Sequence, residues 1–82
     1  MNKTIYSEDH IYIIEQLKKA RKDMGFNQNR VAGLLGKSQS CISKIETGQR
    51  RIDIVQLKRF AKIYKKNLDY FIKRNNDRTN QI

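Results

Sequence analysis

Four polar side chains in the middle of the chain are suited to specific hydrogen bonding: Gln39, Ser40, Ser43 and Lys44. A glutamine amide matches the N6 and N7 edge of adenine, and a lysine ammonium matches the O6 and N7 acceptors of guanine. Both edges are reached from the major groove of double-stranded DNA. The same residue types are also typical of an ordinary solvent-facing helix surface, so this segment alone leaves both interpretations open.

His10 and Cys41 are the residues to weigh for catalysis. His10 follows Asp9 in the first turn of an expected helix, where capping or solvent exposure is more typical than general-base work. Cys41 lies one turn from Lys37 and Lys44, which favour a thiolate, but no motif places a histidine to activate it; a redox-sensing role stays open. The sequence has no metal-ligand spacing and no glycine-rich phosphate loop. We therefore expect no catalytic residue, no metal and no cofactor, and predict that the chain is not an enzyme.

The elements that position these residues are expected to be five short helices. Apolar residues recur at helical spacing over about residues 8 to 24, from Asn27 to Gly36, from Ser38 to Gly48 and from Asp53 to about residue 65, with a short fifth segment around Leu68 and Phe71. Asn, Ser and Asp are good N-cap residues, and glycine is typical just beyond a helix end. Proline is absent and no alternating β-branched run occurs, so we predict an all-α fold.

Length and composition limit the chain to one small domain. With 82 residues and 38% hydrophobic residues it can form one core, and a chain of this size buries only about 60% of its unfolded surface, so a partner subunit would stabilise it. The single cysteine excludes an internal disulfide framework and suits a reducing compartment. No apolar run is long enough for a signal peptide or a membrane span, so we expect a cytoplasmic protein with no membrane partner.

The net charge of +10 lies in the predicted helical body. Residues 1–15 carry −2, residues 16–51 carry +7, residues 52–74 carry +5 and residues 75–82 carry zero. Positive charge spread over folded segments favours a surface that meets a polyanion such as nucleic acid, although solubility is the simpler explanation. RNA is disfavoured because no aromatic platform stands among the basic residues.

The stretch from Gly25 to Gly48 closely resembles the helix-turn-helix of Cro and phage-repressor type transcription regulators, also called the xenobiotic-response-element family. The resemblance covers about residues 13 to 72 and rests on Gln28, Ala32, the Leu35-Gly36 turn and the segment Ser-Gln-Ser-x-Ile-Ser-x-Ile-Glu-x-Gly from Ser38 to Gly48. It implies a compact five-helix bundle of the lambda-repressor-like type, with the helix-turn-helix at helices 2 and 3.

The resemblance also implies roles for individual residues. It assigns base reading to Gln39, Ser40, Ser43 and Lys44, and a structural salt bridge to Arg21 and Glu46. Its DNA phosphate contacts fall on Gln28, Asn27, Lys37, Cys41, Gln49, Arg50 and Arg51. The thiol of Cys41 is a poor replacement for the hydroxyl that family members often carry there.

We expect residues 1–7 to be an N-terminal extension, residues 8–72 the DNA-binding domain and residues 73–82 a polar, disordered tail. The predicted function is a sequence-specific, double-stranded DNA-binding regulator, a homodimeric repressor of a palindromic operator that is cytoplasmic and nucleoid-associated. The alternative is an antitoxin or other module whose main partner is a protein. We expect more aromatic surface near the C-terminus than so small a core requires, from Tyr70, Phe71 and Ile72 with Tyr64 and Phe60. This surface suits either such a protein partner or the seam of a homodimer.

Overall fold

Polar side chains begin three of the five helices. The side chain of Asn27 accepts a hydrogen bond from the Arg30 amide (2.8 Å), that of Ser38 from the Cys41 amide (3.1 Å), and that of Asp53 from the Gln56 amide (2.8 Å). Each of these bonds satisfies an amide that has no partner inside its helix. All three N-caps therefore lie where the sequence predicts them.

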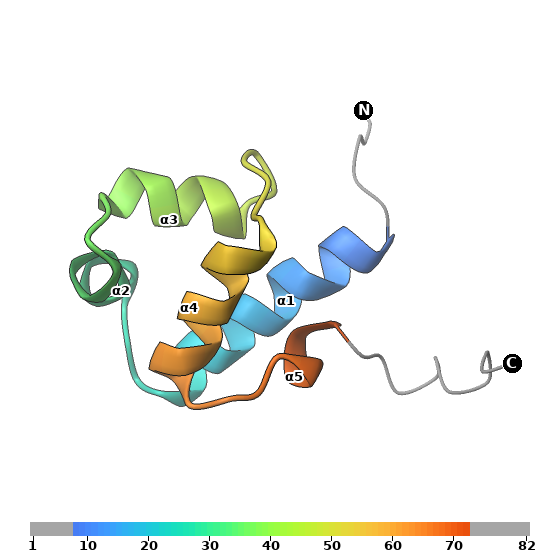
Figure 1. The fold of residues 1–82 in the computed structure, drawn as a ribbon. Coiled ribbons are helices and arrows are strands. Elements are labelled where there is room, and N and C mark those ends of the chain that lie inside the picture. Colours follow the sequence, from blue (N-terminus) through green and yellow to red (C-terminus); the bar gives the residue numbers. More distant parts are fainter. Residues whose placement is uncertain (1–7, 73–82) are drawn as a thin grey trace, which may run out of the picture.

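The computed structural model describes residues 8–72, and in this range the chain forms five helices and no strand (Figure 1). These are α1 (Glu8–Asp23), α2 (Gln28–Leu35), α3 (Gln39–Glu46), α4 (Ile54–Tyr64) and α5 (Asp69–Ile72). The predicted all-α, five-helix bundle is confirmed. The expected N-terminal extension (residues 1–7) and polar tail (residues 73–82) lie outside the described residues.

The predicted helix ends agree closely with the observed ones. α1 ends one residue early, at Asp23, and the Phe26 amide then donates to the Arg21 carbonyl (3.1 Å) across Gly25, which has a φ of 76°. α3 ends at Glu46, two residues before the predicted Gly48, because Thr47 forms its C-cap. α4 ends at Tyr64, and Lys65 takes the left-handed conformation usual for glycine, with a φ of 58°.

One hydrophobic core joins all five helices. Its buried members are Leu17, Ala20, Val31, Ala32, Leu35, Ile42, Ile45, Leu57, Phe60, Ala61, Tyr64 and Phe71. The expectation of extra aromatic surface is wrong for three residues, because Phe60, Tyr64 and Phe71 are at most 1% exposed. A core this small needs its largest side chains inside.

The arrangement leaves one side of α3 open. α2 lies at one end of α3, and the loop that leads into α4 leaves from the other end (Figure 1). α4 crosses α1, and α5 packs beside α1, where the Gln16 side chain donates to the Tyr70 carbonyl (3.1 Å). The side of α3 away from α1 and α4 is free to meet a partner.

Candidate nucleic-acid interface

A tight turn joins α2 to α3. Gly36 adopts a φ of 69°, a conformation that a Cβ atom would strain, and the Lys37 amide donates to the Ala32 carbonyl (2.8 Å). Ser38 then caps α3 immediately. Ala32 is only 4% exposed, and its small side chain lets the two helices approach closely.

α3 has a buried side and a polar side. Ile42 and Ile45 are 0% and 1% exposed and hold the helix against the core. A helix of eight residues is marginal by itself, so this packing is what maintains it. The four predicted base-reading residues lie outside the core: Gln39, Ser40 and Lys44 are exposed and Ser43 is half-buried.

A buried ion pair ties α3 to α1. Arg21 Nε lies 2.8 Å from Glu46 Oε2, and Arg21 Nη2 lies 3.0 Å from Glu46 Oε1. Arg21 Nη1 also donates to the Phe26 carbonyl at 3.0 Å. The Arg21 and Glu46 side chains are 13% and 2% exposed, so this two-bond pair is largely shielded from water. It is the pair that the family resemblance implies.

Hydrogen bonds continue from this ion pair to the outer side of α3. The Gln28 Nε2 atom donates to Glu46 Oε1 at 3.0 Å, and the Gln39 Nε2 atom donates to Gln28 Oε1 at 2.6 Å. The sequence assigns Arg21 and Glu46 to structure and the two glutamines to DNA, with no link between them. The structure joins all four in one relay, which we call the glutamine relay: Arg21, Glu46, Gln28 and Gln39.

Both side-chain amides of the glutamine relay keep hydrogen-bonding groups that the relay itself does not use. After donating one N–H to Gln28, Gln39 keeps a second N–H and its carbonyl oxygen. These are the donor and acceptor that pair with N7 and N6 of adenine. Gln28 keeps one N–H beside the first turn of α2, where backbone amides also favour an anion such as a phosphate.

The loop after α3 is held close to that helix. The Gln49 amide donates to the Lys44 carbonyl (2.9 Å), and its side chain donates to the Thr47 hydroxyl (3.0 Å). Arg50 Nη1 donates to Cys41 Sγ at 3.8 Å, so the Arg50 guanidinium lies beside the thiol. This contact places Arg50 alongside α3 rather than away from it.

Arg51, the next residue of this loop, lies near enough to the start of α1 for its charge to act on His10. Burial and the positive charge of Arg51 both lower the pKa of His10, with burial the larger cause. His10 and Arg51 are far apart in the sequence. The tertiary structure brings them close enough for the Arg51 charge to disfavour protonation of His10. Arg51 itself is exposed.

The surface built by α2, α3 and this loop is positively charged. Between Gln28 and Arg51 the chain has one acidic residue, Glu46, and that carboxylate is buried and paired with Arg21. The basic residues of the same stretch all reach the surface; Lys37 is half-buried, and the exposed ones are Arg30, Lys44, Arg50 and Arg51. A surface with exposed cations and no exposed carboxylate attracts polyanions.

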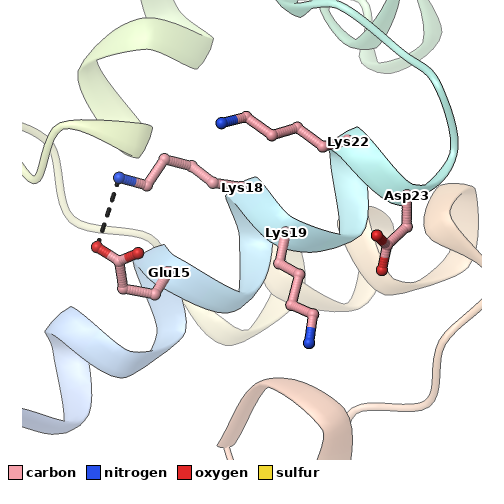
Figure 2. Close-up of a pocket in the computed structure, with 5 residues that line it drawn as sticks. All are labelled: Glu15, Lys18, Lys19, Lys22 and Asp23. Atoms are coloured by element: carbon pink, nitrogen blue, oxygen red, sulfur yellow. Dashed lines mark ion pairs between the residues drawn. The ribbon is translucent and has the colours of Figure 1, made fainter.

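A hollow lies elsewhere, along α1. It encloses about 340 Å³ and is lined by Glu15, Lys18, Lys19, Lys22 and Asp23. Figure 2 shows Lys18 and Lys22 extending on one side of α1 and Lys19 on the other, with Lys18 Nζ 3.4 Å from Glu15 Oε2. Its charges of both signs and its open shape do not resemble an apolar ligand pocket, so we assign it no site.

Two arginines that are not among the predicted site residues, Arg59 and Arg30, support this surface. Arg59 of α4 donates to the Leu35 carbonyl (3.0 Å) and so satisfies the end of α2. Arg30 lies on the first turn of α2 with its guanidinium 5.5 Å from the centre of the Phe26 ring. A basic residue in the first turn of the helix that opens a helix-turn-helix is the signal that points to Arg30.

Comparison with known protein families matches residues 17–71 to the helix-turn-helix domain. The fold and the polar side of α3 thus define a DNA-binding transcription regulator. The chain belongs to the Cro/C1-type helix-turn-helix family, the XRE family, whose members are DNA-binding regulators. Among curated proteins no relative matches the chain.

No helix in residues 8–72 has the length and apolar character needed to cross a membrane. Within the same range, no three His, Cys, Asp or Glu side chains are grouped closely enough to hold a metal ion.

Proposed function

We propose that this regulator is a homodimeric repressor that reads a palindromic operator in double-stranded DNA through α3. The observation that carries the proposal is the glutamine relay. It holds the exposed Gln39 amide in place from a buried ion pair, on a surface without an exposed carboxylate. A side chain that is already oriented loses less conformational entropy when it binds a base.

The proposed roles divide between base edges and phosphates. Gln39, Ser40, Ser43 and Lys44 read bases in the major groove. Phosphates are held at the start of α2, at the turn, in the first part of α3 and in the loop after α3. The residues are Asn27, Gln28, Lys37, Cys41, Gln49, Arg50 and Arg51. Arg50 takes over the contact that the Cys41 thiol makes poorly, since its guanidinium lies beside that sulfur.

Two copies on adjacent half-sites, about one helical turn apart, would cover a promoter and block transcription. The proposed setting is the cytoplasm, in association with the nucleoid, because that is where such an operator lies. The alternative of a module that mainly binds a protein loses most of this support, since Phe60, Tyr64 and Phe71 lie in the core.

The experiment that tests this proposal is selection of bound duplexes from a random pool at two salt concentrations, using the full chain. A two-fold symmetric motif would support a dimeric operator reader. Salt-sensitive binding without a motif would contradict it, because the +10 net charge would then account for the affinity by itself.

Replacing Gln39 tests the assignment of the base-reading residue. Gln39→Ala should reduce discrimination at one base pair of the selected half-site by about 1 to 3 kcal/mol, because one bidentate contact is lost. The control is Gln49→Ala in the loop, which should weaken all duplexes equally. Binding measured on a panel of single-base variants separates the two results. An unchanged preference in Gln39→Ala would show that another side chain reads the base.

A further inference from the structure

The hydrogen bonds of the glutamine relay run in one direction, and that direction begins at Glu46. A carboxylate paired with a guanidinium has two oxygens and no proton to donate, so it can only accept hydrogen bonds. Glu46 Oε2 accepts from Arg21 Nε at 2.8 Å, and Glu46 Oε1 accepts at 3.0 Å from both Arg21 Nη2 and Gln28 Nε2. Gln28 therefore has to turn the nitrogen end of its amide towards Glu46.

The same constraint passes from Gln28 to Gln39. Because the nitrogen of the Gln28 amide faces Glu46, its carbonyl oxygen is the end that remains for Gln39. A carbonyl oxygen can only accept, so Gln39 offers its own nitrogen, and Gln39 Nε2 lies 2.6 Å from Gln28 Oε1. Nε2 is thus the end of the Gln39 amide that faces α2.

The burial of Glu46 protects this arrangement from water. The Glu46 side chain is 2% exposed, Gln28 is half-buried and Gln39 is exposed. The two ends of a glutamine amide are similar in shape and differ mainly in their hydrogen bonding, so an unrestrained amide can turn over. The buried carboxylate removes this freedom from Gln28, and Gln28 removes it from Gln39 at the surface.

The direction of the Gln39 amide matters because the major-groove edge of adenine has two different groups. Adenine presents N7, an acceptor, next to the N6 amino group, a donor. The free N–H of Gln39 pairs with N7 and its oxygen accepts from N6, so N7 lies on the side of α2. A T·A pair presents these two groups in the reverse order of an A·T pair. An amide held in one direction therefore distinguishes A·T from T·A.

We propose that Glu46 is a positioning residue for DNA specificity: by fixing the direction of the Gln28 and Gln39 amides, it decides which strand of the half-site carries the adenine. This inference rests on the proposed function, because it requires Gln39 to read a base through its amide. The carboxylate of Glu46 then has two separable effects. Its pairing with Arg21 stabilises the fold, and its hydrogen bond to Gln28 sets the choice between A·T and T·A.

The experiment uses the full chain and two duplexes that differ only at the base pair where Gln39→Ala loses discrimination. That pair is A·T in one duplex and T·A in the other. Wild type should bind its preferred duplex about 10-fold more tightly than the reversed one. Glu46→Gln should reduce this ratio to about 2-fold or less, because its amide has one oxygen in place of two and no longer holds Gln28 in one direction.

Two further variants separate the relay from the ion pair. Arg21→Lys weakens the two-bond pair but leaves the Glu46 carboxylate as an acceptor for Gln28, so it should lose stability and keep the preference for one duplex. Gln28→Leu keeps the ion pair and interrupts the relay, so it should lose the preference. The preference is a ratio of two affinities of one protein, so any unfolded fraction of a variant cancels from it.

Each contrary result has a distinct meaning. A wild-type preference in Glu46→Gln, or in Gln28→Leu, would show that the relay does not set the direction of Gln39. Loss of the preference in Arg21→Lys would assign the choice of strand to the placement of α3 and overturn the role of the carboxylate. If wild type selects a motif but binds the two duplexes equally, the inference alone fails. If the selection from a random pool returns no motif, the proposed function fails as well.

Discussion

Gly33 is a residue whose surroundings do not require its type. It lies inside α2 and is exposed, and a Cβ atom added there would meet nothing within 4 Å. Glycine in a helix interior costs conformational entropy on folding without gaining a side-chain contact. Nothing in the described residues explains why glycine stands at this position.

Gly33→Ala should therefore raise the free energy of unfolding by about 0.5 to 1 kcal/mol, because alanine restricts the unfolded chain and fits the helix. Gly36→Ala is the matched control and should lower it by about 1 to 2 kcal/mol, since its φ of 69° strains any residue with a Cβ atom. Urea unfolding followed by circular dichroism measures both. A loss of stability in Gly33→Ala would contradict the open space around that residue.

Tyr64 keeps a hydroxyl in the core without a hydrogen-bond partner among the described residues. Burial, and next the charge of Glu46, raise the pKa of its phenol above the usual value of 10.0. Above pH 10 the unfolded chain releases this proton while the folded chain retains it. The contribution of Tyr64 to stability is thus complete below pH 10 and declines as the pH rises towards the raised pKa.

Tyr64→Phe should leave the free energy of unfolding at pH 7 unchanged or raise it by about 1 kcal/mol, because it removes a buried group without a partner. Above pH 10 wild type should lose up to about 1.4 kcal/mol more per pH unit than the variant. Urea titrations of both proteins from pH 7 to 11 give the comparison. Parallel pH profiles would mean that the Tyr64 hydroxyl ionises as easily in the folded chain as in water.

At the scale of elements, the Arg21 and Glu46 pair fixes α3 relative to α1, and through Gln28 it also reaches α2. Glu46 is the acceptor for both partners, so its loss would leave Arg21 as a buried charge without compensation. The packing of Ile42 and Ile45 turns one side of α3 to the core. We interpret the ion pair as a second, directional restraint on the rotation of α3 about its axis.

Glu46→Ala should lower the free energy of unfolding by about 3 kcal/mol, the lower end of the range for breaking a buried pair, since Arg21 keeps 13% of its side chain exposed. Glu15→Ala is the control: it removes an exposed i,i+3 partner of Lys18 and should cost less than about 0.5 kcal/mol. Chemical denaturation gives the free energy of unfolding of both variants. Equally small decreases in the two would contradict the structural role of Glu46.

At the scale of the whole molecule, the distribution of charge decides how the chain meets DNA. From Gln28 to Arg51 the exposed cations have no exposed carboxylate among them, whereas α1 carries acids and bases together. A mixed surface is typical of solvation, and a surface of one sign is typical of a polyanion partner. The side of the molecule that carries α3 is therefore the side expected to face the duplex.

Arg51→Ala should weaken binding to all duplexes by a similar factor and reduce the slope of log K against log salt by about one, because one phosphate contact is lost. The control is Lys19→Ala, which removes one positive charge from α1, on the side away from Lys18 and Lys22 (Figure 2). This variant should leave the slope nearly unchanged. Titrations at four or more salt concentrations give both slopes. Equal changes in the two variants would mean that net charge, and not a local contact, governs the affinity.

Sequence alone predicts the five helices and the turn of the helix-turn-helix, because their signals are local. The N-caps Asn27, Ser38 and Asp53 and the left-handed Gly36 act within one turn of their own helices. The polar side of α3 also follows from the spacing of Ile42 and Ile45. Such features depend on backbone geometry over a few residues, so the residue order is enough to predict them.

Only the tertiary structure decides which distant side chains meet. The hydrogen bond from Gln39 to Gln28, the burial of Tyr64 and Phe71, and the exposure of Ile54 and Val55 all depend on how the helices pack. An apolar residue at helical spacing can face a core or a partner, and its neighbours in the sequence do not distinguish the two. That choice is made by contacts between segments far apart in the chain, whose free energies arise only once the helices have come together.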